Sequence, residues 1–217
     1  MTSARDRILG AIRNNLAAGG RQAEAYPGSG PEPQRARLPP AGQRALFLRM
    51  ASQAAATTDV ATARAEIPAL IAAYLKNHNL PAQIRVAPDP CLTGLDWTSQ
   101  PLLEVSSGGT DGSHSVSVTG AFSAVAETGT LALTSGAPSP TLLNFLPENH
   151  IVVLDAKDLS GSYEDLWAKL KAQYGAEMPR TLNLVTGPSR SGDIEQTILM
   201  GAHGPKRLHI ILLDEQT

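Results

Sequence analysis

Two short apolar runs limit the folds open to this chain more than any other feature of its sequence. Residues 150–154 read His-Ile-Val-Val-Leu, and residues 208–213 read Leu-His-Ile-Ile-Leu-Leu. Such nearly continuous apolar runs are typical of strands buried on both faces of a sheet. Residues 182–185 read Leu-Asn-Leu-Val and predict another buried strand. We therefore expect a sheet that is covered by other elements on both sides.

Helices and further strands are predicted between these runs. Amphipathic spacing and end signals predict helices over residues 5–17, 43–57, 62–78, 162–174 and 193–200, with a helical turn over 142–146. Further strands are expected at 83–87, 102–105 and 116–118, and residues 116–134 are expected to form a local antiparallel insert. Alternating strands and helices predict an α/β fold with a largely parallel sheet.

The first 42 residues differ in composition from the rest of the chain. After the predicted helix, the segment 18–42 contains five prolines among glycines and arginines, which is typical of an extended arm. We therefore divide the chain into an N-terminal helix and arm, residues 1–42, and an α/β domain, residues 43–217. The stripe formed by Ile8, Ile12 and Leu16 must pack on its own domain or on another subunit.

Composition excludes several classes of function. The net charge is −2 and aromatic residues make up 4% of the chain, which argues against nucleic acid as a partner. The single cysteine, Cys91, cannot form an internal disulfide or hold an iron–sulfur cluster or structural zinc alone. There is neither an apolar leader at the N-terminus nor an apolar run of the roughly 20 residues that span a bilayer. We therefore expect a soluble, cytoplasmic protein without a membrane partner.

The first candidate site is the segment Glu127-Thr128-Gly129-Thr130, which lies between two predicted strands. Gly129 in this pattern indicates a bulge, a tight bend or close approach of a ligand to the backbone. A lone buried carboxylate is costly, so Glu127 either faces a ligand or is satisfied by the amides and hydroxyls of Thr128 and Thr130.

The second candidate site is the turn that follows the predicted strand 182–185. It contains Gly187, Ser189, Arg190 and Ser191, and a helix is expected to begin after it. Backbone amides at a helix start, together with hydroxyls and a cation, predict a site for a small anionic ligand. Simple capping of the helix by Ser191 or Asp193 is the alternative.

His203 lies in a turn between glycines and a proline. In such a position it is either a general acid–base group or a structural hydrogen-bonding residue. The residues Asp193 and Glu195 are expected on different faces of the predicted helix, so we expect no metal site with His203. The sequence carries no recognisable cofactor motif either.

Four motifs in this order resemble those of the LUD-domain family. They are Ala126-Glu127-Thr128-Gly129-Thr130-Leu131, Leu146-Pro147 with 150–153, Thr186 to Ser191 with 193–195, and Gly201 with His203-Gly204-Pro205, which together lie within residues 116–213. The resemblance implies a Rossmann-like layered fold similar to the isomerase and CoA-transferase superfamily (NagB/RpiA/CoA transferase-like). It also implies a role in bacterial oxidation of L-lactate to pyruvate, alongside two iron–sulfur partner proteins.

Three functional hypotheses follow. In the first, the chain is a non-redox subunit of this lactate-oxidising assembly and binds a small anion, with Glu127 or His203 moving a proton. In the second, it is a stand-alone enzyme similar to CoA transferases or sugar-phosphate isomerases, in which Glu127 is nucleophile or base; here Thr128 stands where those CoA transferases have asparagine. In the third, it is a structural or regulatory assembly module. The sequence leaves open whether the chain forms a homo-oligomer.

Overall fold

A computed structural model describes residues 3–18, 33–194, 197–201 and 203–215. The chain forms two compact units, Met1–Pro31 and Glu32–Thr217. In the first unit, the expected helix is confirmed as α1 (Ala4–Ala18). Ser3 caps α1, because its hydroxyl accepts the amide of Asp6 at 3.1 Å. The apolar side chains of Ile8 and Ile12 are 61% and 49% exposed.

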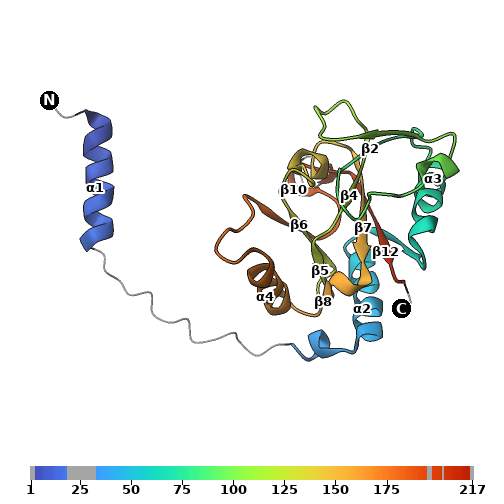
Figure 1. Ribbon diagram of the computed structural model, residues 1–217, viewed down its shortest axis with the longest axis horizontal. Helices are drawn as coiled ribbons and strands as arrows, with labels where there is room; N and C mark the ends of the chain where they lie inside the picture. The colour runs from blue at the N-terminus through green and yellow to red at the C-terminus, as the bar shows by residue number, and fades with distance from the viewer. Residues whose placement is uncertain (1–2, 19–32, 195–196, 202, 216–217) are drawn as a thin grey trace. The chain divides into compact units, whose positions relative to one another are not determined.

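The second unit is built on a six-stranded sheet in which all neighbouring strands are parallel (Figure 1). The α/β class and the parallel sheet are therefore confirmed. In spatial order, the strands are β1 (Thr57–Ala61), β12 (Arg207–Leu213), β7 (Asn149–Asp155), β4 (Val116–Gly120), β2 (Gln83–Val86) and β3 (Glu104–Ser107). The two apolar runs of the sequence are the strands β7 and β12, which are neighbours near the middle of the sheet.

Successive residues of β7 enter two separate hydrophobic cores, as the alternation of side chains along a strand requires. Ile151 and Val153 pack in the core that contains α3 (Ile67–Asn77). Val152 and Leu154 pack in the core that contains α2 (Pro40–Gln53). The sheet is thus covered on both faces, as the sequence predicted.

A second sheet of four strands packs in the same core as α2. Its order is β8 (Leu159–Ser160), β5 (Ser123–Val125), β6 (Thr130–Thr134) and β9 (Leu182–Val185). It is mixed, because β5 is parallel to β8 and antiparallel to β6, so the expected antiparallel insert is only partly correct. The helix α4 (Tyr163–Tyr174) covers the sheet through Leu166 and Leu170.

The helix expected at 162–174 is confirmed as α4, and a capping box fixes its start. Ser162 accepts the amide of Asp165 at 3.2 Å, and the Asp165 carboxylate accepts the amide of Ser162 at 3.1 Å. This reciprocal pair fixes the first turn of the helix. Gly175 ends the helix in the left-handed region, with φ of 56°.

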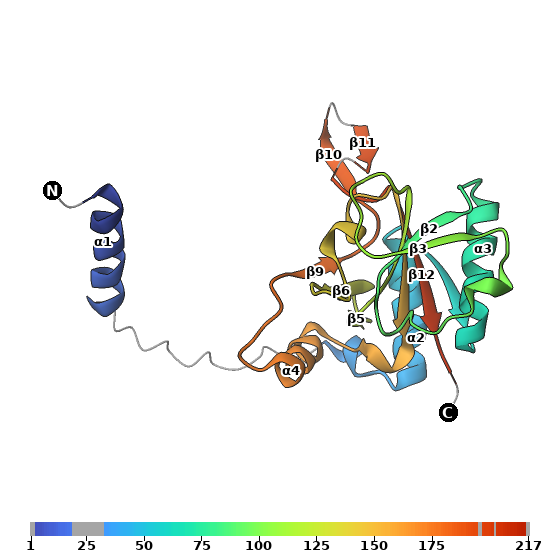
Figure 2. The same cartoon turned by 45° about the horizontal axis from the view of Figure 1, so that its top comes forward.

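Several predictions were wrong. The segment 182–185 is not a strand of the main sheet: it pairs with β6, and Leu184 is 41% exposed. The helix expected at 193–200 is a hairpin of β10 (Arg190–Ile194) and β11 (Thr197–Met200), which Figure 2 shows as a separate pair. Gly192 and β-branched residues disfavour helix here. The strand β1 was not predicted, because it is short and polar and lies at the sheet edge.

Short 3-10 helices complete the second unit. They are η1 (Gln34–Arg37), η2 (Arg64–Glu66), η3 (Trp97–Ser99), η4 (Thr141–Asn144) and η5 (Ala156–Asp158). The helical turn expected at 142–146 corresponds to η4. Among the described helices, none has the length and apolar character to cross a membrane.

Candidate functional site

Gly129 lies at the turn between β5 and β6, with φ of 67°. A Cβ atom at this position would lie 2.6 Å from the carbonyl carbon of Met50 and 2.9 Å from the Cα of Ala51. These are backbone atoms of α2, which cannot move aside as a side chain could. The glycine therefore marks a tight bend, and the backbone that approaches it belongs to a helix of the same domain.

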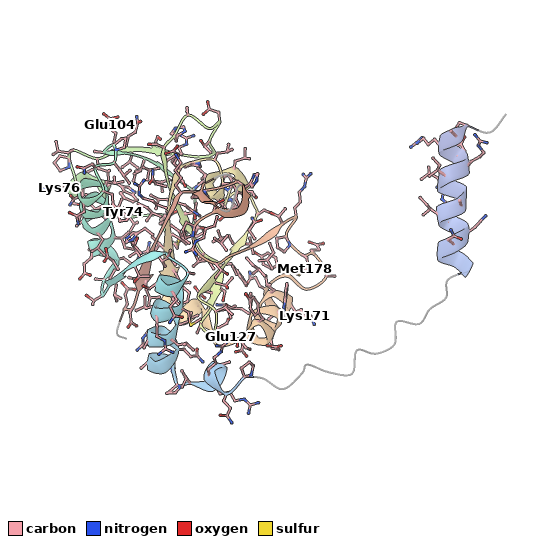
Figure 3. The ribbon with its side chains drawn as sticks, turned by 180° about the vertical axis from the view of Figure 1, so that it is seen from behind. Tyr74, Lys76, Glu104, Glu127, Lys171 and Met178 are labelled. Atoms are coloured by element: carbon pink, nitrogen blue, oxygen red, sulfur yellow. The ribbon has the colours of Figure 1, made fainter. Side chains whose placement is uncertain are left out.

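The carboxylate of Glu127 lies in this turn and is directed to the segment before α2 (Figure 3). The residue is only 6% exposed, and its Oε2 atom lies 3.8 Å from Nε of Arg35 in η1. Burial of a carboxylate is costly without a partner, and this arginine supplies one. The expected hydrogen bonds from the hydroxyls of Thr128 and Thr130 to Glu127 are not formed among the described residues.

Those hydroxyls instead form a cluster with Tyr163 and Thr186. Thr130 is at its centre, with its Oγ1 atom 2.7 Å from that of Thr128, 2.7 Å from that of Thr186 and 3.0 Å from the phenol oxygen of Tyr163. The cluster joins the first candidate segment to the beginning of the second. The two motifs are therefore neighbours in the fold, a relation that the sequence left open.

The second candidate segment packs against the end of α2. Gly187 has φ of 76°, and a Cβ atom there would lie 3.0 Å from the carbonyl carbon of Ala54. Arg190 donates from Nη2 to the oxygen of the same carbonyl at 2.8 Å. A cation at the C-terminal end of a helix is favourable. No helix follows this segment, so the helix start on which the expected anion site depended is absent; that the segment binds an anion stays a prediction. Ser191 belongs to β10, and its side chain lies outside the described part of the structure.

A cavity of about 210 Å³ lies beside this segment. It is at the amino ends of β7 and β12, since His150 and Leu208 are the second residues of those strands. The cavity brings together three predicted site residues, Gly187, Ser189 and His203. Its full lining is Asn144, Phe145, His150, Leu184, Val185, Thr186, Gly187, Pro188, Ser189, His203, Gly204, Pro205 and Leu208. Glu127, Thr128, Gly129, Thr130 and Arg190 are not part of it.

Ser189 holds the two loops of the cavity together. Its amide donates to the carbonyl of Pro205 at 2.9 Å, and its carbonyl accepts the amide of Gly201 at 2.9 Å. Its hydroxyl accepts the amide of His203 at 3.3 Å. The side chain of His203 is exposed at the edge of the cavity, where it can reach a ligand.

Two polar residues of the cavity were not predicted. His150 is 1% exposed, and its Nε2 atom lies 2.8 Å from the hydroxyl of Thr119. Burial lowers the pKa of this imidazole to about 3, so it is neutral at physiological pH. Asn144 is 5% exposed, and its amide has no partner among the described residues. The sequence signal for His150 was its position at the start of an apolar run. No sequence signal marked Asn144.

Residues 112–213 match the family model of the LUD domain. This segment, slightly less than half of the chain, is similar to the LUD domain. It includes β4, β7, β12, the cavity and the turn of Glu127. The matched segment therefore contains both candidate segments, while α2, against which both pack, precedes it in the chain.

Relatives of the chain include lactate utilization proteins. Lactate utilization protein C of Halalkalibacterium halodurans is 31% identical over 103 residues, which are 46% of this chain and 45% of the relative. The protein of the same name from Geobacillus thermodenitrificans is 33% identical over 109 residues, 48% of this chain and 45% of the relative. The chain thus spans about half the length of the curated relatives it matches.

The fold also has a solved counterpart. A crystal structure of a DUF162 family protein from Deinococcus radiodurans superposes with a TM-score of 0.60, covering 81% of this chain and 99% of that protein. The two sequences are 22% identical. This likeness shows that the two proteins share a fold.

Proposed function

We propose that the cavity beside Ser189 binds a small organic anion. We also propose that the chain is the non-redox subunit of a bacterial assembly that oxidises L-lactate to pyruvate. The observation that carries this proposal is the cavity itself, which lies within the segment that is similar to the LUD domain, in a chain with lactate utilization proteins among its relatives. Its volume of about 210 Å³ is below the roughly 300–1,000 Å³ typical of sites for drug-sized ligands. The ligand is therefore a small metabolite.

The polar groups of the cavity can hold a carboxylate without a cation. The amide of Asn144 and the hydroxyls of Thr186 and Ser189 are hydrogen-bond donors to carboxylate oxygens. The neutral imidazole of His150 and the apolar side chains of Phe145 and Leu208 complete the lining around these donors. His203 at the edge is the group that moves a proton in this proposal.

The electrons of the reaction are assigned to partner proteins. Oxidation of a 2-hydroxy acid to a 2-oxo acid releases electrons as well as protons, and iron–sulfur clusters that accept them are held by several cysteines. This chain has one cysteine. The proposal therefore requires the iron–sulfur lactate-utilisation proteins that the family resemblance implies.

Calorimetry with L-lactate, pyruvate and inorganic phosphate tests the ligand site. We expect saturable binding of a carboxylate and about 10-fold weaker binding by Asn144→Leu, because a hydrogen bond to a charged group contributes about 1.5 kcal/mol or more. Arg190→Ala is the matched control: its guanidinium is bound to the Ala54 carbonyl outside the cavity, so its affinity should stay within about 2-fold of wild type. A folded wild-type protein that binds none of the three would refute the site.

The N-terminal helix α1 is proposed to dock on the iron–sulfur partner proteins. The exposed stripe of Ile8 and Ile12 gives α1 an apolar face, and burying this face against a partner would be favourable. We expect that the double variant Ile8→Ser/Ile12→Ser no longer co-purifies with the co-expressed iron–sulfur partners. Arg13→Gln with Asn14→Ser, on exposed positions of the same helix, should still do so. Equal recovery of partners by both variants would exclude α1 as the docking segment.

No described contact favours the stand-alone enzyme. A nucleophilic Glu127 would need to meet a substrate, whereas its carboxylate faces Arg35 and is not part of the cavity lining. A CoA-transferase role for Glu127 is therefore not part of the proposal.

A further inference from the structure

The connections of β2 and β4 leave these neighbouring strands in opposite directions. From β2 the chain continues to β3 at the edge of the sheet, and from β4 it continues in the main sheet to β7 on the other side. Where this reversal occurs in an open parallel sheet, the loops separate and leave a crevice beyond the carboxyl ends of the two strands. Such crevices are the usual ligand sites of α/β sheets.

A second cavity, of about 610 Å³, occupies this position. It is lined by Asp89 and Cys91, which follow β2, and by Gly120 and Phe122 at the end of β4. The other wall comes from the segment 134–139 after β6 and from α4. We call it the switch-point crevice. It is at the opposite end of the strands from the cavity that contains His150, so the two are separate sites.

The polar groups of the crevice are held in fixed positions. Asp89 accepts the amide of Cys91 at 2.9 Å through Oδ1 and the hydroxyl of Ser139 at 2.9 Å through Oδ2. A Cβ atom on Gly120 would lie 2.8 Å from the carboxyl carbon of Asp89, so glycine allows the 89–91 segment to close on β4. Each carboxylate oxygen keeps a lone pair for a ligand donor.

The charge of the crevice disfavours an anion. Lys169 and Asp158 neutralise one another, with Nζ 2.6 Å from Oδ1. The carboxylate of Asp89 has no basic side chain within ion-pair distance among the described residues. Burial raises the pKa of the Cys91 thiol, so this group is neutral. The crevice therefore presents a carboxylate without an ion-pair partner among the described residues, together with hydroxyl groups.

Two aromatic rings also line the crevice. Phe122 and Tyr174 have ring centroids 5.7 Å apart and are inclined at 45°. Aromatic faces pack on the C–H surface of a sugar ring, while carboxylates and hydroxyls bind its hydroxyl groups. From this combination we propose that the switch-point crevice binds a neutral, polyhydroxylated small molecule, a sugar or polyol without phosphate. This site is independent of the anion site proposed above.

Nuclear magnetic resonance titration of the full chain tests this proposal. The probes are D-ribose, D-glucose and myo-inositol, with D-ribose 5-phosphate as the charged counterpart of the first. We expect saturable shifts of the backbone amides of Gly120 and Gly136 with at least one neutral probe, with Kd of about 1 mM or tighter. Ribose 5-phosphate should bind more weakly than ribose, because Asp89 repels its phosphate.

Two variants with different expected results complete the test. Ser139→Ala removes a hydroxyl of the crevice and its hydrogen bond to Asp89. It should weaken binding of the neutral probe about 5-fold or more. Asn144→Leu, in the other cavity, should leave it unchanged. The proposal is overturned if no neutral probe gives saturable shifts, if the shifts map to Ser189 and Gly204 instead, or if the phosphorylated sugar binds more tightly. None of these outcomes depends on whether L-lactate or pyruvate binds.

Discussion

Replacing Gly129 with alanine is expected to lower the free energy of unfolding by about 3–5 kcal/mol. Two costs add at this position. The backbone is in the left-handed region, with φ of 67°, which costs a residue with a Cβ atom about 1–2 kcal/mol. The new methyl group would also overlap the backbone of α2 at Met50 and Ala51, and relieving that overlap requires the turn or the helix to shift.

Gly94→Ala is the matched control for this measurement. Gly94 has φ of 79°, but nothing lies within 4 Å of a Cβ atom placed there. Urea unfolding followed by circular dichroism should therefore show a loss of only about 1–2 kcal/mol for Gly94→Ala. If both variants lose the same stability, packing against α2 is not the reason for glycine in the Glu127 turn.

The second large effect is a loss of stability in mild acid. Burial lowers the pKa of His150 to about 3 and that of His209 to about 4, where the ordinary value is 6.5. Unfolding exposes both imidazoles, which then bind protons below pH 6.5 that the folded chain does not bind. The contribution of these neutral histidines to the free energy of unfolding is complete above pH 6.5 and is lost progressively as the pH falls toward 4. Each histidine should contribute about 1.4 kcal/mol per pH unit to this loss.

Urea unfolding between pH 7.5 and 4.5 measures this dependence. His150→Gln and His209→Gln should each remove about 1.4 kcal/mol per pH unit from the slope, and the double variant should remove both contributions. Carboxylates also titrate in acid, so the difference between wild type and the variants is the quantity to compare. A double variant with the wild-type slope would show that neither histidine is kept neutral by burial.

Elements with a local signal were predictable from the sequence. The apolar runs at 150–154 and 208–213 indicate buried strands without reference to other residues, and they form β7 and β12. For α4, Ser162 is a start signal and Gly175 is an end signal. The failures have two causes. Residues 190–194 and 197–200 pair with one another as a hairpin, and Gly192 with the β-branched residues was a local signal against a helix that the prediction did not weigh. Whether 182–185 joins the main or the small sheet depends on its pairing with the distant strand β6. Propensity within a short window does not contain that information.

The candidate site was predictable only in part, for the same reason. Gly187, Ser189 and His203 were recognised and share a cavity, but its buried members Asn144 and His150 come from elements that look structural in sequence. The partner of Glu127, Arg35, belongs to the segment assigned to the arm. The roles of Glu127 and His203 in proton transfer remain predictions.

The position of α2 shows that residues 112–213 are only part of the folded unit. Residues 112–213 carry the family resemblance, yet the glycine turns at 129 and 187 are shaped against α2, which begins at Pro40. The strands β1, β2 and β3 also precede residue 112. Cutting the chain at the border of the similarity would remove half of the strands of the main sheet and expose both of its cores. The stretch of sequence similarity is thus shorter than the stretch that builds the main sheet and its two cores. A domain border drawn from similarity alone would begin inside this folded unit.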